Sequence, residues 1–360
     1  MCAVAVAGVA GGLAGCGGGG VTSNSSTTLN PESGVTTAGK FVQTNLVADA
    51  AGAGAVTVDT NLKNPWSLAF TSNGPFWVAN NGTGTATVYD DKGTNYGLVV
   101  NIPSSTGGPE GPVTGEVYNN TKVFVVSGYV PGFIFCSSDG TISAWNGNAT
   151  SWIGAAMTNT MVNRSKQNAS YKGLAIGAYN GSYYLYATNF NSGQIDIFNS
   201  AYKYVTSFTD KTVPAGYVPF GIKNIGNYLY VTFTKQSGVA GAGFGYVDKF
   251  NTAGTLLARM VSNGVLNQPW GMEVAPAKFG NVGGDLLVGN FGDGKINAFG
   301  LTTRHWDGAL LNSSGAPLVI PGLWALAAGN GVTGSASDVY FTSGPGNQVH
   351  GLFGQIANAP

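Results

Sequence analysis

The sequence predicts an all-β fold, a six-bladed propeller whose ring is closed by an N-terminal strand pairing into the last blade. A block recurs about every fifty residues after residue 60, as at 64–68, 218–222 and 268–272. It combines a Pro-aromatic-Gly turn, a short apolar strand, a strand rich in Tyr, Trp or Leu, and a Gly-x-Ile-x-x-Phe strand. The 57 glycines and the lack of a helical pattern are typical of short strands joined by tight turns. Such a period predicts a radial array of sheets.

The first sixteen residues form an apolar leader. They end in Leu13-Ala14-Gly15-Cys16, which resembles the lipobox of bacterial lipoproteins. The resemblance implies that residues 1–16 are a lipoprotein-type signal and that Cys16 receives the lipid. No Lys or Arg precedes the apolar run, which departs from the lipoprotein pattern. An Ala/Gly-rich secretory leader without lipidation is the alternative. We expect an exported protein at the bacterial outer membrane or cell surface, or in the periplasm or the medium.

A polar tether and a closing strand follow the leader. Residues 17–40 are mostly Gly, Ser, Thr and Asn and predict a flexible tether, because they offer little apolar surface to bury. Residues 41–47 alternate between apolar and polar side chains. We expect them to be the outer strand of blade six, where they would remove the open edge of the ring. Residues 41–360 are thus predicted to form one propeller domain.

The blades are predicted in chain order. An Asp-Gly pair at 139–140 indicates a hairpin in blade two, and residues 146–170 read as an insertion that lengthens the interval to blade three. The predicted strands lie at 64–68, 76–80 and 86–89; at 112–115, 123–126 and 140–145; at 173–176, 184–190 and 193–198; within 218–250; at 268–271, 285–291 and 294–299; and at 321–324, 339–342 and 349–353.

Charge and cysteine content exclude several classes of function. The 16 basic residues balance the 16 acidic ones, and only 9% of residues are charged. The protein therefore has no excess positive charge that would attract nucleic acid. Membrane contact is expected only through the lipid anchor. Cys2 lies in the leader and Cys16 is the predicted anchor, which leaves Cys136 without a partner. A buried structural thiol is the expected role of Cys136.

Three motifs resemble those of a known family. They are Asn64-Pro65-Trp66-Ser67, the Trp-Val-Ala-Asn-Asn-Gly run at 77–82, and the His-Gly-Leu-Phe-Gly run at 350–354. With them, residues 41–356 resemble an uncharacterised family of bacterial exported proteins with an NHL-like or gluconolactonase-like propeller. Ser67, in place of Gly, is the one departure. The resemblance implies fold and export and leaves activity open.

The sequence contains no strong catalytic signature, such as His-Glu-x-x-His, Gly-x-Ser-x-Gly or a P-loop. Of the two histidines, His305 is predicted on a surface loop. His350 opens the last strand motif and is either a structural residue or a channel-facing one.

A metal site is the weaker of two site hypotheses. Related propeller enzymes hold a cation in the channel with oxygen ligands, and calcium is the candidate cofactor here. An Asn at a strand end also caps turns with its own side chain, which is the alternative for the asparagines. The candidate ligands are Asn80, Glu116, Asn189, Glu273 and Asn290.

A ligand site at the channel mouth is the stronger hypothesis. Aromatic residues recur beside the Pro-Gly turn and could stack on a sugar or another flat ligand, with the strand-end asparagines beside them. Packing between adjacent blades is the alternative for these rings. The predicted ligand-binding residues are Trp66, Asn80, Asn189, Phe220, Trp270, Asn290 and Trp324.

Binding is therefore favoured over catalysis. The expected partner is a small molecule, a glycan or a protein at the central channel face. The catalytic alternative is a metal-assisted lactonase or lyase, in which a cation polarises a carbonyl and His350 or Glu273 moves the proton. The other alternative is a non-catalytic structural component of an extracellular assembly.

Overall fold

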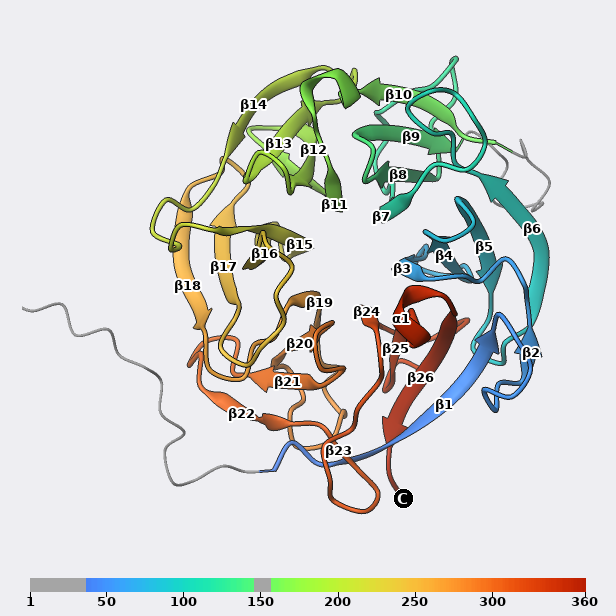
Figure 1. Ribbon diagram of the computed structural model, residues 1–360, viewed down its shortest axis with the longest axis vertical. Helices are drawn as coiled ribbons and strands as arrows, with labels where there is room; N and C mark the ends of the chain where they lie inside the picture. The colour runs from blue at the N-terminus through green and yellow to red at the C-terminus, as the bar shows by residue number, and fades with distance from the viewer. Residues whose placement is uncertain (1–36, 146–156) are drawn as a thin grey trace, which may run out of the picture.

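The protein is a six-bladed β-propeller, as predicted. The computed structural model describes residues 37–145 and 157–360. In these residues six antiparallel sheets surround a central axis, and each sheet runs outward from an innermost strand (Figure 1). The predicted signal at 1–16, with Cys16, and most of the tether at 17–40 lie outside the described residues.

The first three blades follow one another in the sequence. Blade one contains β3 (Pro65–Ala69), β4 (Phe76–Asn80), β5 (Thr85–Tyr89) and β6 (Asn95–Asn101). Blade two contains β7 (Val113–Tyr118), β8 (Phe133–Ser137), β9 (Thr141–Trp145) and β10 (Asn159–Asn163). Blade three contains β11 (Tyr171–Tyr179), β12 (Ser182–Asn189), β13 (Gln194–Asn199) and β14 (Tyr204–Phe208), and the 3₁₀ turn η1 (Ser165–Gln167) precedes it.

The remaining blades repeat this order. Blade four contains β15 (Tyr217–Ile225), β16 (Tyr228–Lys235), β17 (Tyr246–Asn251) and β18 (Leu256–Ser262). Blade five contains β19 (Pro269–Val274), β20 (Leu286–Asn290), β21 (Ile296–Phe299) and β22 (Trp306–Ala309). Blade six contains β24 (Leu323–Ala328), β25 (Val339–Ser343) and β26 (Leu352–Asn358), with the single turn α1 (Pro345–Gln348) between the last two.

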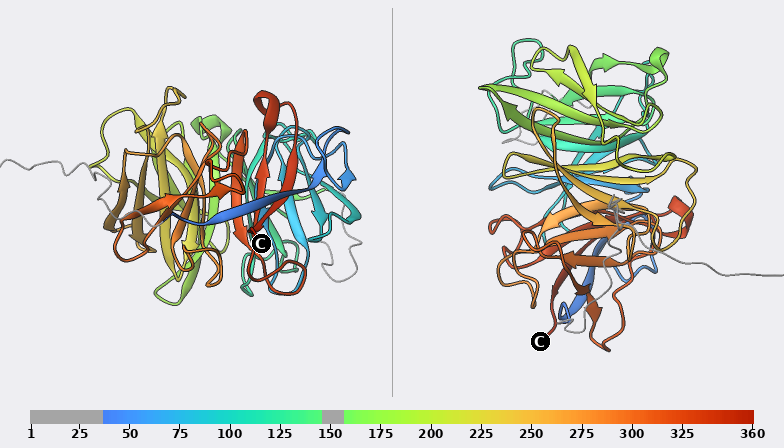
Figure 2. Two further views of the ribbon diagram at one scale, coloured as in Figure 1. Left: turned by 90° about the horizontal axis from the view of Figure 1, so that it is seen from below. Right: turned by 90° about the vertical axis from the view of Figure 1, so that its left-hand side faces the viewer.

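The N-terminal strand closes the ring as predicted. β1 (Lys40–Ala48) pairs antiparallel with β26, from Phe41 opposite Asn358 to Ala48 opposite Leu352. It also pairs in parallel with the short strands β2 (Thr57–Val58) and β23 (Leu311–Asn312). Figure 2 shows β1 crossing the outer side of the ring beside β26. The two ends of the propeller domain are thus joined by a sheet, which protects the last edge.

The Pro-aromatic-Gly motif lies within the innermost strand of its blade, which agrees with the predicted strands and corrects the description of the motif itself as a turn. Pro65, Pro219 and Pro269 lie within β3, β15 and β19, and a register shift follows each proline. Proline is tolerated there because an innermost strand is a sheet edge that has no neighbour on its channel side.

The motif glycine allows neighbouring blades to approach. A Cβ atom on Gly221 would lie 2.1 Å from the carbonyl oxygen of Trp270, and one on Gly271 would lie 2.2 Å from that of Trp324. Both distances are far below van der Waals contact. The motif therefore specifies the tight packing of innermost strands around the axis.

Blade two differs from its prediction. The apolar run at 123–126 was predicted as its second strand, but Phe124 has a left-handed φ of 64° and the strand is β8. The hairpin at 139–140 explains this, because it leaves only a short turn between β8 and β9. The predicted insertion at 146–170 also contains β10, the outer strand of blade two.

The hydrophobic core lies between the blades. Leu174 of blade three, for example, packs in one cluster with Cys136 and Ile142 of blade two. Cys136 is fully buried, and burial raises the pKa of its thiol to about 12. Among residues 37–145 and 157–360, no helix has the length and apolar character needed to cross a bilayer.

Candidate functional site

A cavity of about 370 Å³ lies on the propeller axis, and the innermost strands of all six blades line it. Its walls extend from Trp270 and Gly271 to residues farther along the strands, such as Phe70, Tyr118 and Asn224. Most lining side chains are apolar. The charged residues in the lining are Glu116, Lys223 and Glu273. Such a mixture of apolar walls and few polar groups is characteristic of small-molecule sites.

Glu116 stands at a position that is apolar in every other blade. It follows the motif glycine, Gly115, and pairs across the sheet with Phe135. In each of the other five blades, the residue at the position of Glu116 pairs with the second-strand residue at the position of Phe135. These five residues are Leu68, Leu174, Ile222, Met272 and Leu326.

The Glu116 carboxyl has no partner in the part of the chain that the structure describes. The residue is 5% exposed, and neither Oε1 nor Oε2 accepts a hydrogen bond. Its backbone N–H donates to Ser67 Oγ at 3.0 Å. Burial raises the pKa of this carboxyl well above its usual range, because water no longer stabilises the charged form. Glu116 is thus a buried titratable group without a structural role in the hydrogen bonding.

Glu273, by contrast, is held by its neighbours. Its Oε2 lies 2.5 Å from Lys223 Nζ and accepts the N–H of Ala328 at 3.1 Å. Its Oε1 accepts the N–H of Val274 at 2.9 Å. Lys223 Nζ also donates to the carbonyl of Leu326 at 3.2 Å. Blade five lies opposite blade two in a ring of six, so Glu273 and Glu116 belong to opposite walls of the cavity.

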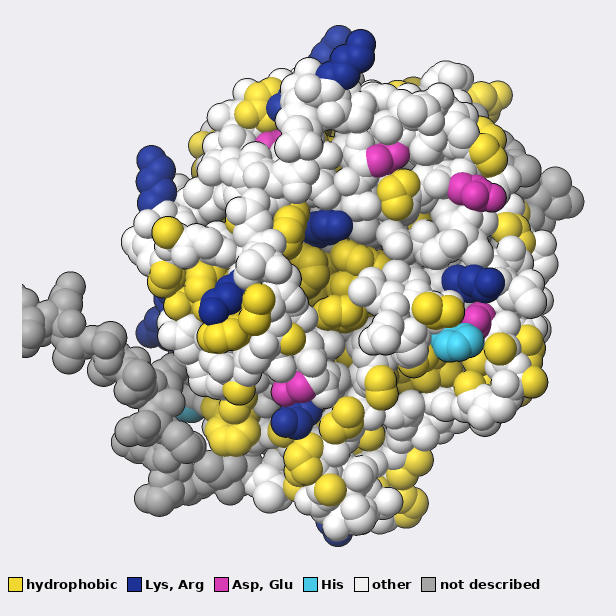
Figure 3. Space-filling view, viewed as in Figure 1, with side chains coloured by type: hydrophobic (Ala, Val, Ile, Leu, Met, Phe, Trp, Pro, Cys, Tyr) yellow, Lys and Arg dark blue, Asp and Glu magenta, His cyan; other side chains and the backbone are white. Residues whose placement is uncertain are grey.

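The four predicted aromatic residues meet at the end of the channel nearer α1. Trp66 stacks on Trp324 with ring centroids 3.6 Å apart, and Phe220 and Trp270 contact both rings edge-on. Trp324 Nε1 donates to Asn64 Oδ1, and Asn64 Nδ2 donates to Gln348 at the end of α1. Figure 3 shows hydrophobic side chains in the hollow at the centre of this face.

These rings pack against one another, which is the alternative that the sequence left open. Each is no more than 8% exposed. Of the four, Trp270 also lines the cavity. A ligand role for the rings stays a prediction.

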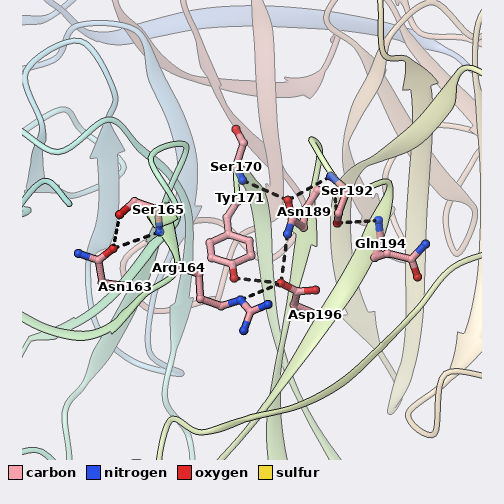
Figure 4. A network of polar contacts seen from close by, with 9 residues as sticks. All are labelled: Asn163, Arg164, Ser165, Ser170, Tyr171, Asn189, Ser192, Gln194 and Asp196. Atoms are coloured by element: carbon pink, nitrogen blue, oxygen red, sulfur yellow. Dashed lines mark hydrogen bonds and ion pairs between the residues drawn. The ribbon is translucent and has the colours of Figure 1, made fainter. Parts of the chain in front are cut away.

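The predicted asparagines lie outside the cavity lining. Asn80 Nδ2 donates to the hydroxyls of Thr85 and Thr87 in its own blade, and Asn290 Nδ2 donates to the carbonyl of Val265. Asn189 accepts the N–H of Ser170 and donates to Asp196 (Figure 4). These bonds are those of residues that stabilise strand ends.

The five predicted calcium ligands do not form one site. Glu116 and Glu273 line the cavity, but Asn80, Asn189 and Asn290 are bound elsewhere and both oxygens of Glu273 are occupied. In the described residues no group of three or more His, Cys, Asp or Glu side chains could hold a metal ion. The geometry therefore gives no support to a calcium centre built from these residues.

Neither histidine lines the cavity. His350 lies in the loop between α1 and β26, and its Nδ1 is 3.1 Å from Asp49 Oδ2. Its side chain is 54% exposed. His305 is exposed in the loop before β22. His350 therefore does not lie where it could transfer a proton in the channel, as the catalytic alternative requires.

Two lysines near the axis are absent from the sequence prediction. Lys223 forms the ion pair described above, and Lys172 occupies the position in blade three that holds Trp66, Phe220, Trp270 or Trp324 in four other blades. Aligning the blades residue by residue would have identified both lysines, and Glu116, as charged exceptions at innermost-strand positions.

Comparisons with known proteins identify relatives in a virus. No family model matches the chain. The "Uncharacterized protein R648" of Acanthamoeba polyphaga mimivirus is 33% identical over 320 residues, 84% of this chain and 76% of that protein. The "Uncharacterized protein L690" of the same virus is 32% identical over 318 residues, 84% of this chain and 82% of that protein. The predicted bacterial origin finds no support in these two relatives.

Solved structures show the same fold. The soluble aldose sugar dehydrogenase of Escherichia coli matches with a TM-score of 0.56 and 11% identity, over 89% of this chain and 100% of that one. A streptogramin B lyase matches with a TM-score of 0.52 and 11% identity, over 88% of this chain and 96% of that one. At this identity the likeness shows the propeller fold alone.

Proposed function

The chain belongs to the family of the mimivirus proteins R648 and L690, whose names assign no activity, and from its own geometry we propose that it binds a small molecule in the central cavity. A cavity of about 370 Å³ suits a small ligand better than a protein segment or a long glycan. Its lining predicts a molecule that is largely apolar and carries at least one hydrogen-bonding group.

The unpartnered carboxyl of Glu116 is the observation that carries this proposal. Leaving a buried polar group without a hydrogen bond costs about 1–3 kcal/mol. Five blades avoid this cost with Leu, Ile or Met, so the sequence of blade two gives up stability at one point on the cavity wall. Proteins retain such locally unfavourable residues mainly where function requires them. A ligand in the cavity would supply the missing partner.

The opposite wall supports the same proposal. Lys223 and Glu273 are fixed by each other and by backbone groups, so they present a preorganised pair of charges to the cavity. A bound molecule would meet a buried, unpartnered carboxyl on one side and an ion pair on the other. This asymmetry would fix the orientation of a ligand that has a polar end.

Catalysis is the second candidate, because a buried carboxyl with a raised pKa is suited to donate a proton at neutral pH. A lactonase-like or lyase-like reaction would use Glu116 as that acid. A streptogramin B lyase shares the propeller fold, which supports this candidate at the level of the scaffold alone.

Export is part of the proposal and is supported by the sequence alone. The lipobox-like residues 13–16 support a lipid anchor on Cys16, and the polar residues 17–40 support a tether between that anchor and the propeller.

An inert structural role would need neither a cavity nor an unpartnered carboxyl.

A thermal-shift screen of the purified chain against small neutral fragments tests the binding proposal. At least one fragment is expected to raise the melting temperature, because a ligand that binds only the folded state stabilises it. The shift should be smaller for Glu116→Leu than for the native chain. No stabilising fragment, or equal shifts in both proteins, would refute the proposal. Product formation from a binding fragment would favour the catalytic candidate.

A further inference from the structure

Two blades break the aromatic pattern at the channel end nearer α1, and one of them does so with a cation. The residue before the motif glycine or its equivalent is aromatic in four blades and Thr114 in blade two, whereas blade three has Lys172. A cation has therefore replaced a ring in a cluster that fills the axis. The equivalent residues in chain order are Trp66, Thr114, Lys172, Phe220, Trp270 and Trp324.

Lys172 lies on aromatic rings and lacks a carboxylate partner. Its Nζ is 5.3 Å from the ring centroid of Trp66 and 5.8 Å from that of Phe190. Within 37–145 and 157–360, no Asp or Glu lies within ion-pair distance of this nitrogen. Burial lowers its pKa, and the thiol of Cys136 is the charge partner that opposes this effect.

That thiol is not a counter-ion at neutral pH. Burial raises the Cys136 pKa to about 12, so the sulfur is protonated and uncharged. Among the described residues, the ammonium group of Lys172 is thus balanced by ring faces alone, and cation–π contacts are weak partners for a charge. An anion would be a stronger partner, since its interaction with a partly buried cation is weakly screened.

We propose that this end of the channel is a second binding site, for an organic anion whose carboxylate is carried on a flat apolar group. The carboxylate would bind Lys172, and the flat group would lie against Trp66 and Phe190. Lys172, Trp66 and Phe190 lie outside the lining of the cavity in the proposed function, and this second proposal does not depend on ligand binding in that cavity.

A second polar group in the same cluster supports this ligand class. Trp66 Nε1 is buried and, among the described residues, donates no hydrogen bond, whereas Trp270 Nε1 donates to the carbonyl of Lys172 and Trp324 Nε1 donates to Asn64. A ligand with carboxylate oxygens could accept hydrogen bonds from both the unused indole N–H and the unpaired ammonium group of this cluster. Figure 3 shows a Lys or Arg side chain at the rim of the central hollow and hydrophobic side chains on its floor.

The test compares benzoate with benzamide, a neutral analogue of nearly the same shape. Binding to the full chain is measured by calorimetry and by the fluorescence of the tryptophans. Benzoate should bind about tenfold more tightly than benzamide, as expected for one charge-assisted hydrogen bond. Lys172→Met should remove this preference and Lys172→Arg should retain it. Lys122→Met, a change at an exposed lysine, should leave the preference intact.

Each other outcome overturns the proposal. Equal binding of benzoate and benzamide, no benzoate binding up to its solubility limit, or an unchanged preference in Lys172→Met would each show that the site does not recognise anions. If Lys172→Met does not fold, Lys172→Gln takes its place, since it also removes the charge. If no neutral fragment binds in the cavity screen, the proposed function fails but this test still stands, because it compares benzoate with benzamide at a different site.

Discussion

Lys223 of blade four and Glu273 of blade five form an ion pair at the central cavity, with Nζ 2.5 Å from Oε2. Lys223 Nζ also reaches the carbonyl of Leu326 in blade six, and Glu273 accepts the N–H of Ala328 there. One pair of side chains thus connects three successive blades at their inner edges. The equivalent positions in the other blades are Ala or Val, so the other described blades have no such ion pair at this position of their innermost strands.

Lys223→Met should lower the free energy of unfolding by about 1–2 kcal/mol, between the values for exposed and buried pairs. The loss arises because Glu273 keeps its charge without the ammonium group. Urea unfolding measures it. The double variant Lys223→Met with Glu273→Gln should recover part of the loss. A double variant that is less stable than the single one by a further similar amount would show that the two side chains act independently.

Phe41→Ala should destabilise the whole propeller by about 3–5 kcal/mol, because Phe41 is a buried residue of the closing strand. Its ring stacks on Phe279 with centroids 4.4 Å apart. Val42→Ala is the matched control on the same strand, since Val42 is 39% exposed, and it should change stability little. If the two variants unfold at the same urea concentration, the strand does not hold the ring closed.

Cys136 should resist thiol reagents in the folded protein. The residue is fully buried, and its raised pKa leaves almost no thiolate at neutral pH. Peptide mapping by mass spectrometry after treatment with iodoacetamide should find Cys136 unmodified in the folded protein and modified after unfolding in urea. Modification of the folded protein at the rate of a free thiol would contradict the burial.

The stability of the protein should fall with rising pH because of Glu116. Its folded-state pKa lies above the unfolded value of about 4.3, so the folded state holds the proton more tightly. The free energy of unfolding therefore decreases as pH rises from the unfolded pKa through the folded one. Urea unfolding from pH 4 upward, about the unfolded pKa, should show this slope for the native chain and a smaller one for Glu116→Gln. Parallel profiles would mean that the Glu116 carboxyl is hydrated or paired.

The sequence predicted the architecture because each blade repeats the same packing problem. Pro, an aromatic residue and Gly recur because a free strand edge, a filled axis and a close approach between blades recur with them. The sequence misplaced a strand in blade two, where the runs at 123–126 and 133–137 are both apolar and only the hairpin distinguishes them.

The candidate site was less predictable. The repeat drew attention to the residues that recur, such as Asn80 and Trp66, and these prove to bond or pack within the protein. Two charged side chains without an ionic or hydrogen-bonding partner among the described residues, Glu116 and Lys172, are exceptions to the repeat. Whether an exceptional charge has a partner depends on side chains from other blades, which no local pattern records.

Replacing Glu116 by the residue type of the other blades tests the central claim most directly. If Glu116 serves a ligand, Glu116→Leu should raise the free energy of unfolding by about 0.5–2 kcal/mol and weaken fragment binding in the cavity. The reverse change in blade three, Leu174→Glu, should cost about 3–5 kcal/mol, because it buries a second carboxyl without a partner. A Glu116→Leu protein that is less stable than the native chain and binds fragments equally well would show that Glu116 is a structural residue.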